Sequence, residues 1–484
     1  MVFIIPGRCW FKMSTCPLLP PRTLAPSSGG AAAAPRAAGP HAVIHVGPPK
    51  TGTSHLQDFF TNNLARLRTH GWSFPYLFGG GENGWCRSAL FHKNGYELNK
   101  LLNTGGFSRP GEKLEDEKAA HENTSKVADE NAALLAFFRH ASSAPSWCPG
   151  LDAATRQALR DAKTTDDLAA VVKRWWAREF ARVASGASGA PNLLLSDEGF
   201  HTPAESYAAF FGPALKAAGF ARVTVVSMYR TPRVAFARSG FNQGYETYKA
   251  RGYLLLPPVL TFNERVDAMV EHRHLQARAL LSAYSSSAGF DVVNVDLAGV
   301  AAAGLDEADV VACEVMGLPC TAEGKWPAGT ATVVTNARQS TPDRIAEVAA
   351  AYYRWQAGRA KCALPTHEKI GAFFDALEKE LGPLLTAADE VCTDYTALET
   401  RALAEGEAVL DAAACVLHRV EGRVPAPAEE LTYCSLDPGR LAGRPDVVAV
   451  FARFCVRVGG RAAPLQRNGT DRGRSAARAG LGLG

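Results

Sequence analysis

Residues 43–57 read Val-Ile-His-Val-Gly-Pro-Pro-Lys-Thr-Gly-Thr-Ser-His-Leu-Gln, and this stretch decides the fold. Its apolar start at 43–46 predicts a buried strand, which Gly47 and the two prolines after it bring to an end. From Lys50 onward the sequence indicates the start of a helix. The free N–H groups of a first helical turn point at one spot, where the helix dipole adds positive potential. The stretch therefore predicts a cradle for a phosphate-like or sulfate-like group.

The side chains of this cradle reinforce its preference for an anion. Lys50 adds a full positive charge, and the neighbouring hydroxyls add hydrogen-bond donors. The candidate binding residues are Gly47, Pro49, Lys50, Thr51, Gly52, Thr53 and Ser54. In a Walker A loop the lysine follows the second glycine, whereas here Lys50 precedes Gly52. Taken alone, the motif can also be interpreted as a generic phosphate loop or as a Gly-Thr turn before a helix.

A second informative stretch lies downstream, at residues 222–243. The β-branched residues at 223–226 predict a strand, and Tyr-Arg-Thr-Pro at 229–232 ends it. The proline suits the first turn of the helix that we expect next. Arg230 then stands at the end of the strand, and Ser239 lies about two and a half turns into the helix. An isolated arginine usually makes a surface ion pair, but its planar fork also matches phosphate oxygens.

Together, the two stretches resemble the motifs of sulfotransferases that use 3′-phosphoadenylyl sulfate (PAPS) as donor. Pro-Lys-Thr-Gly-Thr-Ser is similar to the family's 5′-phosphosulfate loop, and Tyr-Arg-x-Pro with a later serine is similar to its 3′-phosphate motif. The resemblance covers residues 41–60, 192–201 and 222–243, and it continues more weakly to about residue 296. It implies a P-loop NTPase-like sulfotransferase fold, PAPS as co-substrate, adenosine 3′,5′-bisphosphate as product, and no metal.

A third stretch fits the same resemblance and supplies a candidate general base. The apolar run at 192–196 predicts a strand, and Asp197-Glu198-Gly-Phe-His201 follows it directly. A Ser-x-Glu after such a strand is similar to carbohydrate-type sulfotransferases, in which the glutamate is proposed to remove the acceptor's proton. A positioned carboxylate can take that proton as the new S–O bond forms. Glu198 is therefore the first candidate for the base, and Asp197 and His201 are rivals. A helix-capping glutamate and a loop histidine are the structural alternatives.

The resemblance also implies a mechanism of in-line transfer. The phosphosulfate is expected in the loop at 47–54, and the 3′-phosphate on Arg230 and Ser239. Lys50 and the loop N–H groups would stabilise the charge that develops on the transferred group and on the leaving oxygen. The expected catalytic residues are Lys50, Glu198 and His201. The expected acceptor is a hydroxyl or amine of a carbohydrate or small molecule.

Two other function classes stay open at this level. A P-loop kinase would transfer phosphoryl from ATP and would need Mg²⁺ held by an acidic strand end, for which Asp197 is the candidate. A non-catalytic nucleotide- or glycan-binding protein would need no base, so the presence of Lys50 together with Glu198 favours an enzyme. One residue departs from the resemblance, because His55 stands where many cytosolic relatives carry an aromatic residue that stacks on adenine.

The rest of the chain alternates between helix and strand patterns. The expected further helices are 56–70, 166–184, 262–284 and several within 342–404, and the expected further strand is 290–296. Such alternation predicts an α/β fold with a mainly parallel central sheet flanked by helices. Because ligands bind at the carboxyl ends of parallel strands, Lys50, Glu198 and Arg230 are expected at one rim.

Length and charge favour a globular enzyme with basic ends. The chain has 484 residues, of which 47% are hydrophobic and 21% charged, enough for a large core. The net charge of the whole chain is +4, but residues 1–40 carry +4 and residues 456–484 carry +5. Subtracting both leaves residues 41–455 with a net charge of −5. An acidic body argues against nucleic acid as a partner. We expect a disordered leader or targeting segment at 1–40, a sulfotransferase domain at 41–455 and a disordered basic tail at 456–484. A helical insertion is expected at about 105–165.

The sequence says less about location and cysteine chemistry. No apolar run of about 18 residues suggests a transmembrane segment. The expected location is therefore the cytoplasm or an organelle after removal of the leader, and the Golgi lumen stays open if the true start is missing. The eleven cysteines form no Cys-x-x-Cys pair and no zinc spacing. They can form disulfides in an oxidising lumen or stay as buried free thiols.

Overall fold

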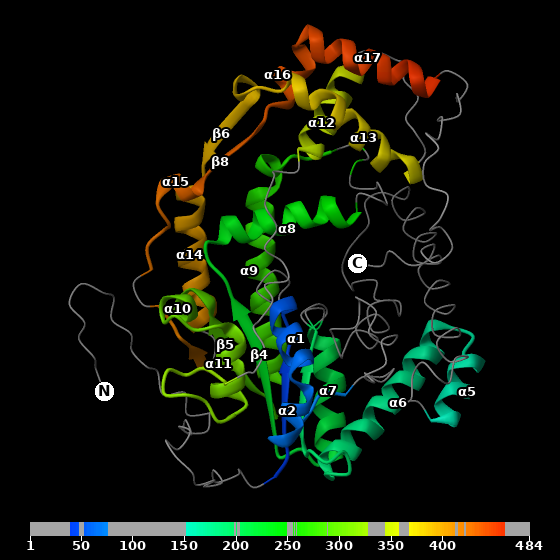
Figure 1. The fold of residues 1–484 in the computed structure, drawn as a ribbon, viewed down its shortest axis with the longest axis vertical. Helices are drawn as coiled ribbons and strands as arrows, with labels where there is room; N and C mark the ends of the chain where they lie inside the picture. The colour runs from blue at the N-terminus through cyan, green and yellow to red at the C-terminus, as the bar shows by residue number, and fades with distance from the viewer. Residues whose placement is uncertain are drawn as a thin grey trace, which may run out of the picture. The chain divides into compact units, whose positions relative to one another are not determined.

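The computed structural model divides the chain into two compact units. Unit 1 comprises residues 1–231, 273–337 and 404–423, and unit 2 comprises residues 232–272, 338–403 and 424–484. The structure describes residues 39–47, 53–75, 152–197, 200, 204–248, 255, 257, 259–287, 289–327, 344–357, 367–411, 415–420 and 423–459. Figure 1 labels most of their helices and some of their strands. Most of the expected leader at 1–40, of the expected insertion at 105–165 and of the expected tail at 456–484 lies outside these residues.

Unit 1 is built on a six-stranded sheet in which every strand runs parallel to its neighbours. The strands are β1 His41–His45, β2 Trp72–Ser73, β3 Asn192–Ser196, β4 Arg222–Tyr229, β5 Asp291–Asp296 and β7 Cys415–Leu417. Their order is β2-β3-β1-β4-β5-β7. The central strands are buried along nearly their whole length, as the runs of Val, Ile and Leu in a two-sided parallel sheet require. The expected α/β class with a parallel central sheet is thereby confirmed.

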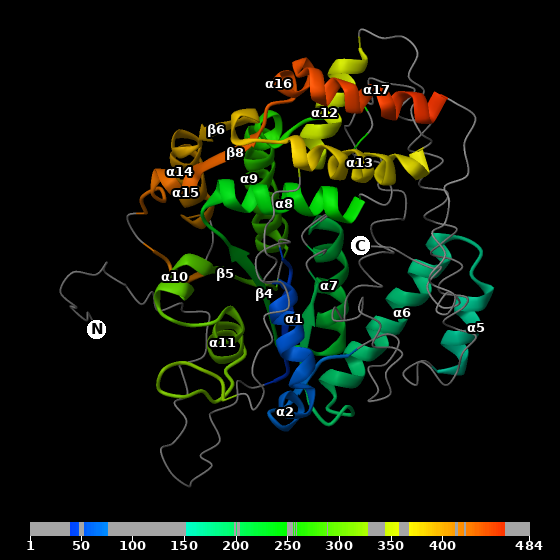
Figure 2. The same ribbon diagram turned by 45° about the horizontal axis from the view of Figure 1, so that its top comes forward.

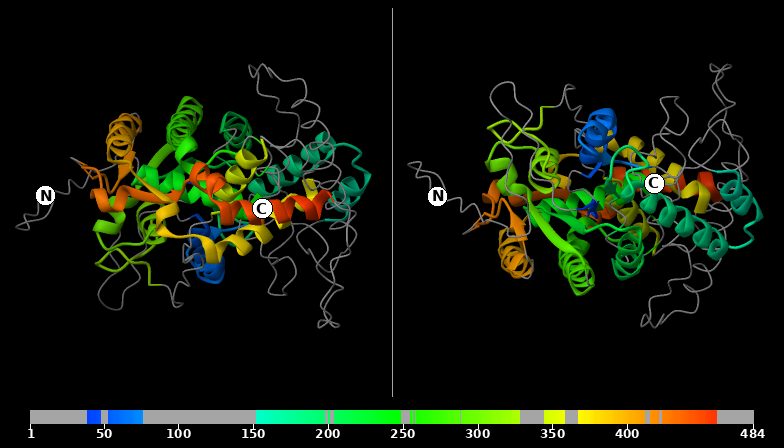
Figure 3. Two further views of the ribbon diagram at one scale, coloured as in Figure 1. Left: turned by 90° about the horizontal axis from the view of Figure 1, so that it is seen from above. Right: turned by 90° about the horizontal axis from the view of Figure 1, so that it is seen from below.

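Helices cover both faces of this sheet. The helices of unit 1 are α1 Thr53–Asn62, α2 Leu64–Thr69, α5 Ala153–Asp161, α6 Thr165–Ala184, α7 Ala204–Ala218, α10 Leu297–Ala302, α11 Glu307–Val310 and the π-helical turn η3 Val311–Val315. Helices α9 Phe262–Ser286 and α14 Thr396–Asp411 have residues in both units. Val43 packs in the core beneath α1 with Leu56 and Phe60. Its neighbour Ile44 points to the other face and packs in the core that includes Trp176 of α6. Figure 3 shows α1 and α7 on opposite sides of the sheet.

Local sequence explains α6, the longest helix that lies wholly in unit 1. Thr164 accepts a hydrogen bond from the Asp167 N–H (3.1 Å), and the Asp167 carboxylate accepts one from the Thr164 N–H (2.9 Å). This capping box, with acidic residues in the first turn, fixes where the helix begins. Trp175 and Trp176 are buried with ring centroids 4.9 Å apart, so both are core residues.

Unit 2 is mainly helical. Its remaining elements are α8 Arg233–Tyr248, α12 Ile345–Gln356, α13 His367–Leu381, α15 Ala428–Leu431, α16 Pro438–Gly443, α17 Pro445–Gly459, the 3₁₀ turns η4 Gly382–Leu384 and η5 Ala387–Asp389, and the antiparallel strands β6 Glu390–Asp394 and β8 Thr432–Leu436. Figure 2 shows α12, α13, α16 and α17 gathered together. Tyr352 of α12 joins these helices, because its ring contacts Phe374 of α13 (5.8 Å) and Phe451 of α17 (5.5 Å). The unit therefore forms around an aromatic core contributed by segments far apart in the sequence.

Each unit contains a disulfide. Cys313–Cys320 closes a short loop in unit 1, with a sequence separation of 7. Cys392–Cys434 links β6 to β8 in unit 2 across a separation of 42, and these two residues lie directly opposite each other in the strand pair. The cysteine pattern left bridges and free thiols open, and for these four residues the structure has bridges.

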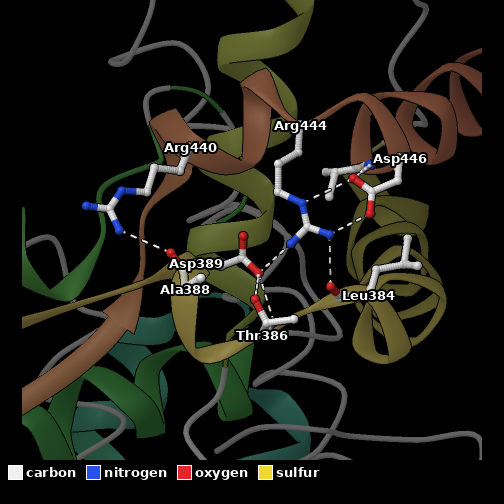
Figure 4. Close-up of polar contacts among 8 residues, drawn as sticks. Leu384, Thr386, Ala388, Asp389, Arg440, Arg444 and Asp446 are labelled. Carbon is white, nitrogen blue, oxygen red and sulfur yellow. Dashed lines mark hydrogen bonds and ion pairs between the residues drawn. The ribbon is translucent and has the colours of Figure 1, made fainter.

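An arginine fork ties together three turns of unit 2. Figure 4 shows the Arg444 guanidinium between Asp389 and Asp446, both of which it contacts at 2.5 Å. It also donates to the Leu384 carbonyl at 3.0 Å. Asp389 in turn accepts from the Thr386 N–H at 2.8 Å. Burial alone would raise the pKa of Asp389, but the hydrogen bonds from Arg444 and Thr386 outweigh it and hold the pKa below its usual value.

Several elements differ from the sequence expectations. The helix expected at 56–70 is interrupted at Asn63, whose side-chain amide donates to the Phe59 carbonyl (2.8 Å) and so competes with the helical hydrogen-bond pattern. The helical region expected at 342–404 contains the strand β6. The short strands β2 and β7 were not expected at all. Among the described residues, no helix combines the length and apolarity needed to cross a membrane.

Candidate functional site

The carboxyl ends of β1, β3 and β4 meet at the place that the motifs predict. β1 lies between β3 and β4, so the chain leaves it towards one half of the sheet and later crosses to the other half, which makes this a topological switch point. The Met228 N–H donates to the Gly47 carbonyl (3.2 Å), and the Asp197 N–H donates to the His45 carbonyl (3.1 Å). The loop after β1 therefore begins between Asp197 on one side and the end of β4, just before Arg230, on the other.

The two ends of the predicted anion cradle are described by the structure. Gly47 has a φ of 85°, a left-handed conformation that favours glycine, and it turns the chain away from the strand. Thr53 and Ser54 are the first two residues of α1. The strand before the predicted cradle and the helix after it are thus as expected. The other predicted cradle residues, Pro49, Lys50, Thr51 and Gly52, lie outside the described residues.

The candidate bases follow β3. Glu198 and His201 lie outside the described residues, so their roles stay predictions. Asp197, the rival candidate, has no exposed surface. Next to it in the sequence, the Ser196 hydroxyl shares a hydrogen bond of 2.8 Å with Nδ1 of the buried His45. Because a base must reach a proton on an acceptor that arrives from solution, the burial of Asp197 favours its two rivals.

Arg230 stands just beyond β4 and is half-buried. Burial lowers the pKa of its guanidinium, and the nearby Glu307 carboxylate raises it again in part. Burial also raises the pKa of Glu307, with a further rise from Asp306, while Arg230 and His55 oppose it. Arg230 therefore already has a carboxylate in its electrostatic surroundings, and a phosphate bound there would compete with Glu307.

The structure adds a histidine–aspartate pair that sequence reasoning missed. His55 Nε2, in the first turn of α1, lies 2.8 Å from Asp306 Oδ2. This hydrogen bond is the main cause that raises the pKa of His55. Burial would raise the pKa of Asp306, but His55 and the Ala308 N–H together lower it. The only local signal was Asp306 as an N-cap before an apolar run, and its Oδ1 does accept from the Ala308 N–H (2.8 Å).

This pair belongs to a cluster that could hold a divalent cation. One ligand atom from each of His55, Asp306 and Glu307 lies within 4.8 Å of the others. A mixed set of imidazole and carboxylate suits Mn²⁺ or Zn²⁺ better than Mg²⁺, which prefers oxygen ligands. A cation bound through Nε2 of His55 would have to replace the hydrogen bond to Asp306. The cluster is therefore compatible with a metal but satisfied without one.

A buried network fixes the end of β4 immediately before Arg230. The Arg423 guanidinium lies 4.9 Å from the centre of the Tyr229 ring and forms an ion pair with Asp296 at the end of β5. Asp296 is fully buried and also accepts from the N–H groups of Ala298 (3.1 Å) and Val420 (3.0 Å). Because every oxygen of this carboxylate has a partner, the network is structural and positions the strand end.

The second half of the predicted 3′-phosphate motif has a different environment. Ser239 is half-buried on α8, which belongs to unit 2, whereas Arg230 belongs to unit 1. At the N-terminus of α8, the buried Glu399 accepts from the N–H groups of Arg233 (2.7 Å) and Val234 (2.8 Å). A protein carboxylate thus occupies the anion-binding end of this helix. Ser239 therefore keeps a predicted contribution through its hydroxyl, not through the helix terminus.

Comparisons with known proteins identify no relative of this chain. No protein-family model, no curated protein and no solved structure matches it. The site has to be judged from its own residues: a turn at a switch point, an arginine at the next strand end, and a histidine–carboxylate cluster beside them.

Proposed function

We propose that this chain transfers a sulfuryl group from PAPS to a hydroxyl or amine of a carbohydrate or small-molecule acceptor. The main support is the placement of three strand ends, because Gly47, Asp197 and Arg230 follow adjacent parallel strands. Neighbouring strands lie about 4.8 Å apart, so we expect the predicted phosphate-binding loop, the candidate base and Arg230 to share one edge of the sheet. The sequence motifs suggest the chemical identity of the ligand, and the order of the strands supports a site at this edge.

The transfer step requires a preorganised positive environment. The acceptor oxygen attacks sulfur in line, the new S–O bond forms, and the bond between sulfur and the bridging phosphate oxygen breaks. Lys50 and the N–H groups at the start of α1 stabilise the negative charge that builds up on that bridging oxygen. Adenosine 3′,5′-bisphosphate leaves with the electron pair of the broken bond.

The acceptor proton needs a destination. Glu198 follows β3 by two residues and is our choice for the base, with His201 as the rival. The base takes the proton as the acceptor oxygen becomes bonded to sulfur, so no separate alkoxide has to form. Asp197 is disfavoured in this role because it is completely buried.

Nucleotide binding would rearrange the charges around Arg230. The 3′-phosphate brings two negative charges to a guanidinium that already has the Glu307 carboxylate in its electrostatic surroundings. Glu307 has a raised pKa, chiefly through burial, and a second negative group nearby would raise that pKa further. PAPS binding should therefore favour proton uptake by this carboxylate.

A transfer assay with labelled PAPS tests the proposal. We expect label on a polysaccharide or small-alcohol acceptor, inhibition by adenosine 3′,5′-bisphosphate, and a loss of about 10²–10³ in rate for Lys50→Ala. Lys216→Ala removes an exposed lysine of α7 and is the matched control, with an unchanged rate. Absence of sulfuryl transfer to every acceptor, with phosphoryl transfer from ATP instead, would overturn the proposal.

One observation favours a second candidate, a metal-dependent P-loop kinase. The cluster of His55, Asp306 and Glu307 stands beside the start of α1, where a cation could bridge to a nucleotide phosphate. The two candidates differ in their response to a chelator. Activity with ATP and Mn²⁺ that EDTA abolishes supports the kinase, whereas sulfuryl transfer that survives EDTA supports the sulfotransferase.

A further inference from the structure

Unit 2 contains a pocket to which the proposed transfer assigns no role. Residues of α8, the start of α9, the start of α12 and β8 line it, among them Arg238, Asn242, Asn263, Arg344, Glu347 and Tyr433. Its cavity volume is about 20 Å³. A single buried water needs about 10–15 Å³ by the same measure, so the cavity admits the end of a small polar group and not a nucleotide.

Arg238 is the cation of this pocket. It is half-buried, and its guanidinium carbon lies 4.2 Å from the centre of the Tyr433 ring. Across the part of the chain that the structure describes, no carboxylate pairs with it. Stacking on an aromatic face holds a guanidinium in place and leaves its N–H edge free for a bidentate anion.

Asn242 is a second polar side chain of the pocket without a polar partner among the described residues. It follows Arg238 by four residues on α8, so the two side chains lie on one face of the helix. Its amide has no hydrogen-bond partner within the described ranges, although it lines the pocket and is half-buried. An amide offers both a donor and an acceptor, which is the combination that a hydroxyl next to a carboxylate requires.

The remaining polar side chains form a fixed wall. Asn263 accepts from the Tyr395 hydroxyl and donates to Ser435 Oγ (3.0 Å), so both ends of its amide have a partner. Arg344 pairs with Glu390 at 2.7 Å. The buried Glu347 carboxylate follows three residues later in the first turn of α12, where the helix dipole favours it. Glu390 thus offsets Arg344, and the pocket lining keeps two opposite charges, the stacked guanidinium of Arg238 and the buried carboxylate of Glu347.

We propose that this pocket binds the carboxylate of a small hydroxylated acid, such as a sugar acid. The carboxylate pairs with the fork of Arg238, and an adjacent hydroxyl meets the amide of Asn242. The flat carboxylate suits a narrow cavity of about 20 Å³ better than tetrahedral sulfate or phosphate does. The assignment stands independently of the proposed sulfuryl transfer, because every group that carries it belongs to unit 2.

Calorimetric titration of the full chain with sodium glucuronate tests the assignment, with glucose and inorganic sulfate as comparison probes. We expect binding of glucuronate, no binding of glucose, and weaker binding of sulfate. Arg238→Gln should weaken glucuronate binding roughly 10- to 100-fold, because a charge-assisted pair is lost. Arg238→Lys keeps the charge without the planar fork, so its glucuronate affinity should lie between those of the wild type and Arg238→Gln. Asn242→Ala should weaken glucuronate binding less than Arg238→Gln does.

Arg354→Gln is the matched control. Arg354 is an exposed arginine of unit 2 that pairs with Glu264 (3.2 Å) and does not line the pocket, so its variant should bind as the wild type does. Near-ultraviolet circular dichroism establishes that each variant is folded. Equal glucuronate affinity for wild type and folded Arg238→Gln would overturn the assignment. So would failure of the wild type to bind glucuronate, or equal binding of glucose.

Discussion

Unit 1 and unit 2 satisfy their buried polar groups in different ways. In unit 1 a parallel sheet pairs most backbone groups, and its strands are continuous apolar runs. In unit 2 single side chains connect segments that are distant in sequence, as Glu399 does at the start of α8 and Arg444 does between three turns. The buried polar groups of unit 1 are therefore paired mainly by the regular hydrogen bonds of its sheet, whereas those of unit 2 rely on a few individual side-chain contacts.

The same contrast holds for the two arginines near the start of α8. Arg230 of unit 1 has Glu307 in its electrostatic surroundings, whereas Arg238 of unit 2 stacks on an aromatic ring and forms no ion pair among the described residues. A guanidinium with an acid beside it is already stabilised, so a ligand must displace that acid. A guanidinium over a ring is available to an anion at once. Substitutions in the two units should therefore have separable consequences.

The largest expected difference concerns the two disulfides. Loop-closure entropy predicts about 4 kcal/mol of stabilisation for Cys392–Cys434, with its separation of 42, and about 2.5 kcal/mol for Cys313–Cys320, with its separation of 7. Replacing each pair by alanines and measuring urea unfolding should lower the stability of unit 2 more than that of unit 1. Equal losses, or a larger loss from Cys313 and Cys320, would break the comparison.

The next largest expected effect concerns Glu399, whose carboxylate binds the N–H groups at the start of α8. Glu399→Gln keeps the shape but removes the charge that two backbone N–H groups contact, so we expect a loss of about 2–3 kcal/mol in unit 2. Hydrogen exchange should show faster exchange at Arg233 and Val234, with little change in the strands of unit 1. The control is Glu429→Gln, which alters an exposed glutamate. Unchanged protection at the start of α8 would contradict the assigned role.

Unit 1 should respond to acid through His41. Burial, with a smaller effect of Arg222, lowers its pKa from 6.5 to about 3, and its Nε2 lies 2.8 Å from Thr224 Oγ1. Below pH 6.5, His41 takes up a proton in the unfolded chain but not in the folded chain. The contribution of His41 to the free energy of unfolding is therefore fully present only above pH 6.5. It then falls by about 1.4 kcal/mol per pH unit towards pH 3. Trp72, whose ring centroid lies 5.4 Å from that of His41, is a local fluorescent reporter.

The variant His41→Gln separates the pH dependence caused by His41 from acid unfolding that has other causes. Its stability should depend less steeply on pH between 6.5 and 5, where the wild type loses about 2 kcal/mol more. Urea unfolding followed by tryptophan fluorescence at both pH values provides the comparison. Identical slopes for variant and wild type would show that the His41 imidazole does not carry the effect.

The smallest expected effect concerns the acid beside Arg230. Glu307→Gln removes a carboxylate that competes with a bound phosphate, so adenosine 3′,5′-bisphosphate should bind about two- to five-fold more tightly. The proton uptake that accompanies binding should also diminish. Calorimetry in two buffers of different ionisation enthalpy measures both quantities. Weaker binding by this variant would mean that Glu307 assists the nucleotide, as a metal ligand would.

The sequence predicted unit 1 well because its elements carry local signals. The apolar runs at 192–196 and 222–228 are strands, and the glycine at position 47 adopts the positive φ that a sharp exit from β1 requires. Parallel order then follows from the alternation of strands and helices. β2, with only Trp72 and Ser73, is too short to produce a recognisable alternation.

Contacts over long sequence distances escaped the sequence analysis. His55 and Asp306 are 251 residues apart, and nothing in either neighbourhood indicates the other. Glu399 and Val234 are 165 residues apart, and Glu399 carries no sign that it caps another helix. Such pairs are set by how helices pack in three dimensions, so a linear pattern contains no record of them. The polar parts of the site and of unit 2 were therefore the least predictable.

The most direct test of the central claim compares two nucleotides that differ by one phosphate. Calorimetry on the wild type should give adenosine 3′,5′-bisphosphate at least about ten-fold tighter binding than adenosine 5′-monophosphate, without added metal. Arg230→Ala should abolish that preference, and Lys50→Ala should weaken both nucleotides alike. Equal affinities in the wild type, or a preference for ATP that depends on a divalent cation, would contradict the account.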